Sequence, residues 1–67
     1  MKPTKEEVGR RLTQLRLRNG YNSQKSLAEY IGTSRCNIHN CESGKFYPSY
    51  NLFYLLNEQG LSVKELL

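Results

Sequence analysis

Residues 23–44 read SQKSLAEYIGTSRCNIHNCESG, a pattern that predicts two short helices joined by a tight turn. Ser23 and Ser34 each precede a helical segment, where a serine hydroxyl caps the free N–H groups of a helix start. Gly32 and Gly44 each follow such a segment, because glycine tolerates the positive φ with which many helices end. Only three residues separate the two segments, so we expect the helices to cross steeply and the second one to protrude.

Three more helices are predicted outside this stretch. The first covers about Lys5–Asn19 and begins at the capping box Thr4–Glu7. Another follows Pro48-Ser49 and ends at Gly60, and a short fifth helix begins at a second capping box, Ser62–Glu65. Apolar residues recur at helical spacing, and none alternate as in a half-buried strand. We therefore predict an all-α fold: one domain over residues 1–67, built as a compact five-helix bundle.

Length and charge narrow the range of functions. A chain of 67 residues holds one small core and has no room for a deep cleft between lobes. Residues 1–35 carry eight Lys and Arg against three acids, a net charge of +5, whereas residues 36–67 carry two against three. A basic half favours a polyanionic partner, either nucleic acid or an acidic membrane surface. The alternative is a solvated cationic face that serves only solubility.

The composition gives little support to an enzymatic function. The chain has one histidine, no aspartate and no glycine-rich phosphate loop, so no set of residues suits nucleophilic or acid–base catalysis. We expect no enzyme activity, no cofactor and no small-molecule substrate. Cys36, His39 and Cys41 are metal-ligand types, but the two thiols diverge by about 140° on one helix, so we expect neither a metal site nor a disulfide between them.

The expected compartment is the cytoplasm. No apolar run reaches the length that spans a bilayer, and the first residues, MKPTKEE, lack the apolar segment of a secretion signal. We therefore expect no membrane partner. Because cytoplasmic thiols stay reduced, Cys36 and Cys41 should both be free.

The ordered set of motifs resembles the Cro and cI repressor family. Residues 23–38 resemble its helix-turn-helix, and residues 8–16, VGRRLTQLR, resemble its first helix. Glu42-Ser43-Gly44-Lys45 with Pro48-Ser49 is similar to its E-x-G-K…P-S segment, and residues 59–67, QGLSVKELL, are similar to its closing stretch. The resemblance covers nearly the whole chain. It implies a lambda-repressor-like five-helix bundle that binds operator DNA through a central helix-turn-helix, usually as a homodimer.

Two positions depart from the family pattern. The family usually has one residue between the glycine and the serine that open the second helix, whereas this chain has Tyr21 and Asn22. This insertion leaves open how the chain enters that helix. Cys41 stands where the family commonly has Trp or Leu, so we expect a nearby aromatic residue to fill the gap. Phe46 and Tyr54 are both candidates.

A helical wheel divides the third helix into two faces. With Ile38 turned towards the second helix, Cys41 and Glu42 lie within about 60° of it, on the inner side. Cys36 and Asn40 fall on the opposite face. The outer face is therefore the one that we expect to meet a partner.

Base-reading roles are assigned to Cys36 and Asn40 of this outer face, to Asn37 beside it, and to Arg35, which can reach base edges from the helix start even as a side-pointing residue. Arg35 suits a bidentate bond to guanine, Asn40 suits adenine, and Asn37 is a weaker candidate for the same contact. Cys36 is small and apolar enough to meet a thymine methyl group. The resemblance supports Arg35 and Asn40, because the matching positions read bases in the family. The amide of Gln24 is a candidate to orient Arg35.

Phosphate contacts are expected around the reading helix. Gln24 opens the second helix, where free N–H groups favour an anion, and Ser34 has a hydroxyl to donate. Lys45 matches a backbone-contacting position of the family, and Tyr50 has a phenol to donate. His39 suits a pH-sensitive phosphate contact, because histidine changes charge near neutral pH. The alternative for Asn37 and His39 is a plain solvent-facing position.

A structural role is implied for Arg16 and Glu42. The resemblance pairs them as a partly buried salt bridge that links the first helix to the end of the third. Arg16 would then belong to the scaffold and not to the DNA contact.

The predicted function is sequence-specific binding of double-stranded DNA by a transcription regulator, expected to be a repressor. A homodimer on two half-sites about 34–36 Å apart is expected, with Phe53, Leu61 or Leu67 of the last two helices at its surface. The alternative function is a helix-turn-helix used as a protein-interaction module, either antitoxin-like or binding another partner.

Overall fold

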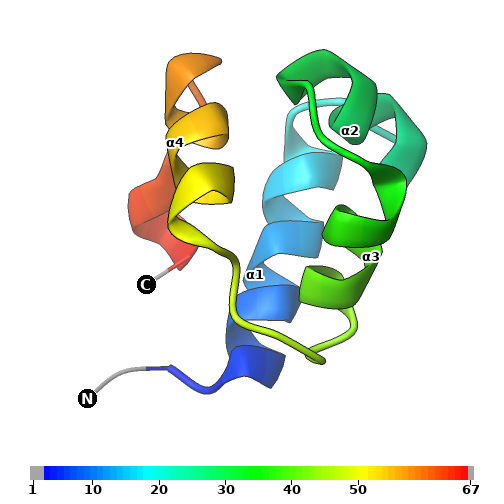
Figure 1. Cartoon of the computed structure of the whole chain (residues 1–67). Helices are drawn as coiled ribbons and strands as arrows, with labels where there is room; N and C mark the ends of the chain where they lie inside the picture. Colours follow the sequence, from blue (N-terminus) through cyan, green and yellow to red (C-terminus); the bar gives the residue numbers. More distant parts are fainter. Residues whose placement is uncertain (1–2, 67) are drawn as a thin grey trace.

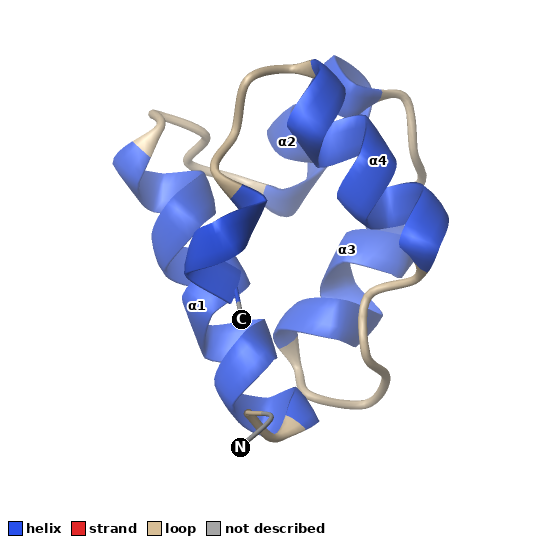
Figure 2. Cartoon of the chain, turned by 90° about the vertical axis from the view of Figure 1, so that its left-hand side faces the viewer, coloured by secondary structure: helices blue, strands red, loops and turns tan. Residues whose placement is uncertain are grey.

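The computed structural model of the chain describes residues 3–66, apart from the side chain of Glu65. Its elements in chain order are α1 (Lys5–Arg18), α2 (Gln24–Ile31), α3 (Arg35–Glu42), α4 (Tyr50–Glu58) and a 3₁₀ helix, η1 (Val63–Leu66). The described residues contain no strand (Figure 2), and their radius of gyration is 10.4 Å. The predicted all-α class and compact shape are confirmed. Within the described residues, no helix combines the length and the apolar character that a membrane crossing requires.

The prediction of a fifth helix is wrong if that helix is taken as an α-helix. Residues Val63–Leu66 form one turn of 3₁₀ helix instead. Four residues are enough for the i→i+3 hydrogen bonds of this tighter helix but give the i→i+4 ladder of an α-helix little to build on. The chain therefore has four α-helices in its described part.

Each α-helix begins where the sequence predicts a cap. The residue before the helix has an extended backbone, and its side-chain oxygen accepts a hydrogen bond from the N–H three residues further on. The pairs are Thr4 with Glu7 (3.2 Å), Ser23 with Ser26 (3.0 Å), Ser34 with Asn37 (3.1 Å) and Ser49 with Leu52 (3.2 Å). At the other end of α2, Gly32 adopts the left-handed φ of 83° and donates its N–H to the carbonyl of Ala28.

The helices close around one core (Figure 1). α1 packs against α3 and η1, α2 packs against α3 and α4, and α4 also contacts η1. The buried side chains are Val8, Leu12, Leu15, Leu27, Ala28, Ile31, Ile38, Cys41, Leu52, Leu56, Leu61 and Leu66. Burial of these side chains is the main favourable term that holds four short helices together.

Burial also corrects part of the expected dimer surface. Leu61 is only 5% exposed and belongs to the core, so it is not available to a second chain. Phe53 is half-buried and packs against the same core. Leu67 lies outside the described residues.

The gap expected around Cys41 is not filled by an aromatic residue. Phe46 and Tyr54 are each 54% exposed, so both candidates are wrong. Instead, α1 approaches α3 closely at Gly9. A Cβ atom on Gly9 would meet the carbonyl oxygen of Cys41 and would lie 2.7 Å from that of Glu42. The backbones of α1 and α3 are therefore in close contact beside Cys41.

Candidate nucleic-acid interface

The inner face of α3 lies as the helical wheel predicts. Ile38 and Cys41 are buried against α1 and α2. Arg35, Cys36 and His39 are exposed and together line a surface hollow of about 150 Å³. Asn40 is half-buried. The outer face thus brings a guanidinium, a thiol and an imidazole together at the surface.

Hydrogen bonds donated by Asn37 hold the turn before α3. The Asn37 backbone N–H donates to Ser34 Oγ at 3.1 Å, and its side-chain Nδ2 donates to Thr33 Oγ1 at 3.0 Å. The hydroxyl of Ser34 accepts in this arrangement, so its own proton is left to donate outward. Asn37 has committed one amide proton to the turn, which leaves its carbonyl oxygen and one donor for any base contact.

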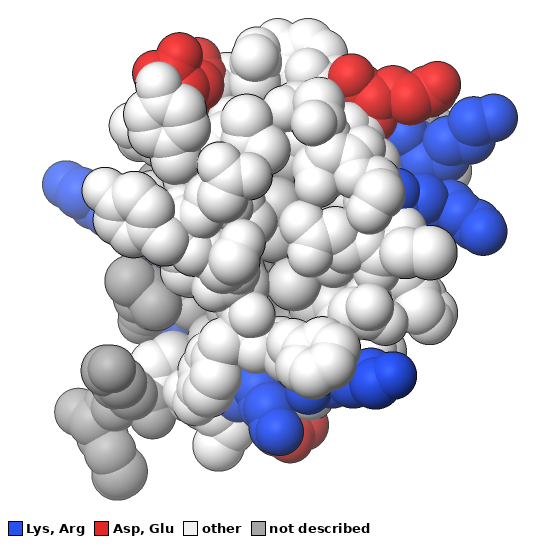
Figure 3. All heavy atoms as spheres, viewed as in Figure 1, with Lys and Arg blue, Asp and Glu red and all other residues white. Residues whose placement is uncertain are grey.

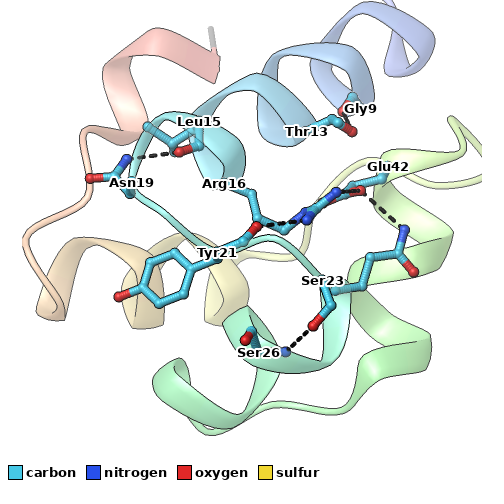
Figure 4. Close-up of polar contacts among 10 residues, drawn as sticks. Gly9, Thr13, Leu15, Arg16, Asn19, Tyr21, Ser23, Ser26 and Glu42 are labelled. Atoms are coloured by element: carbon cyan, nitrogen blue, oxygen red, sulfur yellow. Dashed lines mark hydrogen bonds and ion pairs between the residues drawn. The ribbon is translucent and has the colours of Figure 1, made fainter.

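A polar network holds the end of α3 to α1. Arg16 Nε lies 2.8 Å from Glu42 Oε2, and the two side chains are 9% and 5% exposed. Arg16 Nη2 also donates to Glu42 Oε1 at 3.4 Å. The salt bridge expected from the sequence is therefore present, and Figure 4 shows Arg16 reaching from α1 towards Glu42. Because both groups are almost completely shielded from water, each depends on the other for compensation of its charge.

The backbone carbonyl of Tyr21 completes this network. Arg16 Nη1 donates to Tyr21 O at 2.7 Å, and Tyr21 N–H donates back to the carbonyl of Arg16 at 3.0 Å. The Tyr21 ring packs on that of Tyr30, with 5.2 Å between the centroids. The sequence alone does not predict this role, although the one extra residue in the Tyr21-Asn22 segment was the available signal.

Gln24 does not orient Arg35 as expected. Its Nε2 donates to Glu42 Oε1 at 3.0 Å. Glu42 is the last residue of α3 and Arg35 is the first, so the amide is engaged at the opposite end of the helix. This contact places Gln24 within the network of Arg16 and Glu42.

The other candidate phosphate contacts are exposed around α3. Lys45 follows the helix, and its Nζ lies 5.5 Å from the centroid of the Phe46 ring in a cation–π contact. Its backbone N–H donates to the carbonyl of Asn40 at 3.0 Å. Tyr50, the first residue of α4, is 87% exposed. His39 is exposed on α3 itself.

Charge is distributed unevenly on the face seen in Figure 3. Lys and Arg side chains lie on the side of α2 and α3, next to an acidic side chain, and below the loop that follows α3. Another basic side chain lies at the opposite edge, and the centre of the face is uncharged. Exposed cations on the side of α2 and α3 can attract a polyanion.

The two cysteines differ in their surroundings. Both are free thiols, Cys36 exposed and Cys41 buried. Burial raises the pKa of the Cys41 thiol above its ordinary value of 9.0, and the nearby Glu42 carboxylate raises it further. Among the described residues, no three side chains of metal-ligand type lie close enough to hold an ion.

Comparisons with known proteins add no relative: no family model, no curated protein and no solved structure matches the chain.

Proposed function

We propose that this protein binds double-stranded DNA in a sequence-specific manner, with α2 and α3 acting as a helix-turn-helix and α3 lying in the major groove. One observation carries the proposal. The inner face of α3 is fixed by the core and by the Arg16–Glu42 salt bridge, and its outer face presents Arg35, Cys36 and His39 to solvent. A rigid helix with a polar outer face is what direct reading of base edges requires.

The dimensions of α3 support the same function. Its eight residues form an α-helix, which with its side chains is about 10–12 Å across, and the major groove, about 12 Å wide, admits a helix of this diameter. Arg35 in the first turn would enter the groove first. Asn40 and Cys36 lie further along the outer face and supply an adenine-pairing amide and an apolar surface for a thymine methyl group.

Residues at the edges of α3 suit contacts to the phosphate backbone. Ser34 retains a proton to donate, and Lys45 and Tyr50 are exposed beyond the end of the helix. Backbone contacts of this kind set the register of a protein on the duplex but carry no sequence information. The net charge of +4 supports such binding through counterion release. The regulatory outcome that we propose is repression, by occupation of a promoter.

The experiment is a fluorescence-anisotropy titration of labelled duplexes. Wild-type protein should bind random duplex at low salt, and selection from a random pool should yield a preferred sequence. Arg35→Ala should reduce the preference at one base pair, with a cost of about 1–3 kcal/mol. Lys64→Ala, which removes one exposed charge from η1, is the control and should leave that preference intact. Absence of duplex binding at low salt would overturn the proposal.

A second function is favoured by the exposed aromatic side chains. Phe46, Tyr47, Tyr50 and Tyr54 are each more than half exposed, and aromatic residues are enriched at protein–protein interfaces. The alternative proposal is therefore an interaction module of the antitoxin or partner-binding type. Silence in the DNA titration, with wild-type circular dichroism, would favour this alternative.

A further inference from the structure

A single carboxylate joins three helices of this protein. Glu42, at the end of α3, receives Arg16 of α1 at 2.8 Å and Gln24 of α2 at 3.0 Å. The Glu42 side chain is 5% exposed. Arg16 already compensates the negative charge of this carboxylate. The hydrogen bond from Gln24 therefore adds a directional constraint and no further charge compensation.

The Gln24 bond ties α3 to α2 at a second point. The start of α3 is already held close to α2 by residues 32–34, which leave it little freedom to move. The end of α3 lies one helix length away, and Gln24 opens α2. The bond between them therefore spans the open side of the corner that the two helices form.

We infer that Gln24 is a positioning residue that sets the angle of α3 relative to α2, and thereby the alignment with base edges of Asn40, which lies near the far end of α3. This inference rests on the proposed DNA binding. A rotation of 5° moves one end of a 12 Å helix by about 1 Å relative to the other. Hydrogen bonds to bases weaken steeply with such displacements, so a small change in angle should reduce sequence preference.

A direct phosphate contact is the competing role for Gln24, and the two roles differ in their salt dependence. Loss of a phosphate contact weakens binding to all sequences and reduces the slope of log K against log salt by about 0.9. Loss of positioning leaves the slope unchanged and lowers the ratio of preferred to random binding.

The test uses Gln24→Met, which keeps the length of the side chain and removes its donor. Anisotropy titrations over a salt series compare wild type, Gln24→Met and Lys45→Ala on the preferred and on random duplexes. We expect Gln24→Met to lower the preference ratio by about 3- to 10-fold with an unchanged slope, and Lys45→Ala to reduce the slope by about one contact. A reduced slope with an intact ratio, or no change in either quantity, overturns the inference.

A second measurement tests positioning without DNA. Residual dipolar couplings of backbone amides report the angle between α2 and α3 in the free protein. We expect this angle to change in Gln24→Met and to be retained in Lys25→Ala, a substitution at the exposed neighbouring residue. An unchanged angle in Gln24→Met overturns the inference even where wild-type protein binds DNA. If wild-type protein binds no duplex, the proposed function fails, whatever the couplings show.

Discussion

Gly9 lies in the middle of α1, at a position where any side chain would clash with the backbone of α3. The carbonyl oxygens of Cys41 and Glu42 both stand in the path of a Cβ atom at this position. Main-chain atoms cannot rotate away as a flexible side chain can, so the two helices would have to separate.

Gly9→Ala should therefore destabilise the fold by about 1–3 kcal/mol, the usual cost of overpacking. The sign of this change in stability is informative, because an alanine in an open helix position stabilises the helix by up to about 1 kcal/mol relative to glycine. Urea unfolding followed by circular dichroism measures the difference. Arg10→Ala, an exposed neighbour in the same helix, is the control and should stay within about 0.5 kcal/mol of wild type. A Gly9→Ala protein as stable as wild type would show that α1 and α3 are further apart.

Arg16 and Glu42 form the nearly dry salt bridge of the fold, with the two side chains 9% and 5% exposed. Arg16→Ala leaves the Glu42 carboxylate without its counter-charge and should cost about 3–5 kcal/mol. That loss is comparable to the whole stability of a domain this small. The double variant Arg16→Met with Glu42→Leu removes both charges and should recover much of the loss. Thermal unfolding compares the three proteins, and an unchanged midpoint in Arg16→Ala would contradict the structural role.

The two thiols should react at very different rates. Cys36 is exposed, whereas Cys41 is buried and has a raised pKa, so its reactive thiolate is scarce near neutral pH. Titration with Ellman's reagent should show one fast thiol in the native protein and two in urea. Cys36→Ser should abolish the fast reaction. A second fast thiol in native wild-type protein would place Cys41 at the surface.

At the scale of the elements, the sequence predicts helix starts well because a cap depends on chemistry within three residues. All four α-helices begin after the predicted Ser or Thr. The fifth element was predicted from a similar pattern, and a cap does not distinguish a 3₁₀ turn from an α-helix. The inner face of α3 was also predictable, because the helical period alone places Ile38 and Cys41 together.

Contacts between residues far apart in the chain are harder to predict from the sequence. The Arg16–Glu42 salt bridge came from the family resemblance and not from spacing. The bond from Gln24 joins residues 18 positions apart, and nothing in the local pattern indicates it. The close approach at Gly9 depends on how two helices pack, which also explains why Phe46 and Tyr54 were wrongly expected beside Cys41.

Ser34 combines a cap with a proposed DNA contact, and the two roles can be separated. Ser34→Ala should lower stability by about 1 kcal/mol, because Asn37 N–H loses its side-chain acceptor and keeps only the Ser34 carbonyl. Ser34→Asp keeps a capping oxygen and should keep stability, but its charge should weaken duplex binding by repelling phosphate. Ser34→Asn, an uncharged capping residue, is the matched control. Urea unfolding and anisotropy measure the two effects, and Ser34→Asp binding as tightly as Ser34→Asn would remove Ser34 from the interface.

At the scale of the whole molecule, size limits how much DNA one chain can read. The principal extents are 30 × 21 × 21 Å, and α3 has only eight residues. Successive major grooves on one face of the duplex lie about 34–36 Å apart. If the chain binds DNA as proposed, one chain would therefore reach a single groove segment, and a longer site would require two chains.

We expect the preferred duplex to contain two related half-sites one helical turn apart and to bind two chains. Sedimentation velocity with labelled duplex should give two chains per DNA. Insertion of 5 bp between the half-sites turns them to opposite faces of the duplex and should abolish any cooperativity between the chains. Insertion of 10 bp returns the half-sites to the same face but places them further apart. If contact between the chains contributes to affinity, both insertions weaken binding. If binding to the wild-type and 5-bp duplexes is equally tight, the chains bind independently, and the homodimer has no part in recognition.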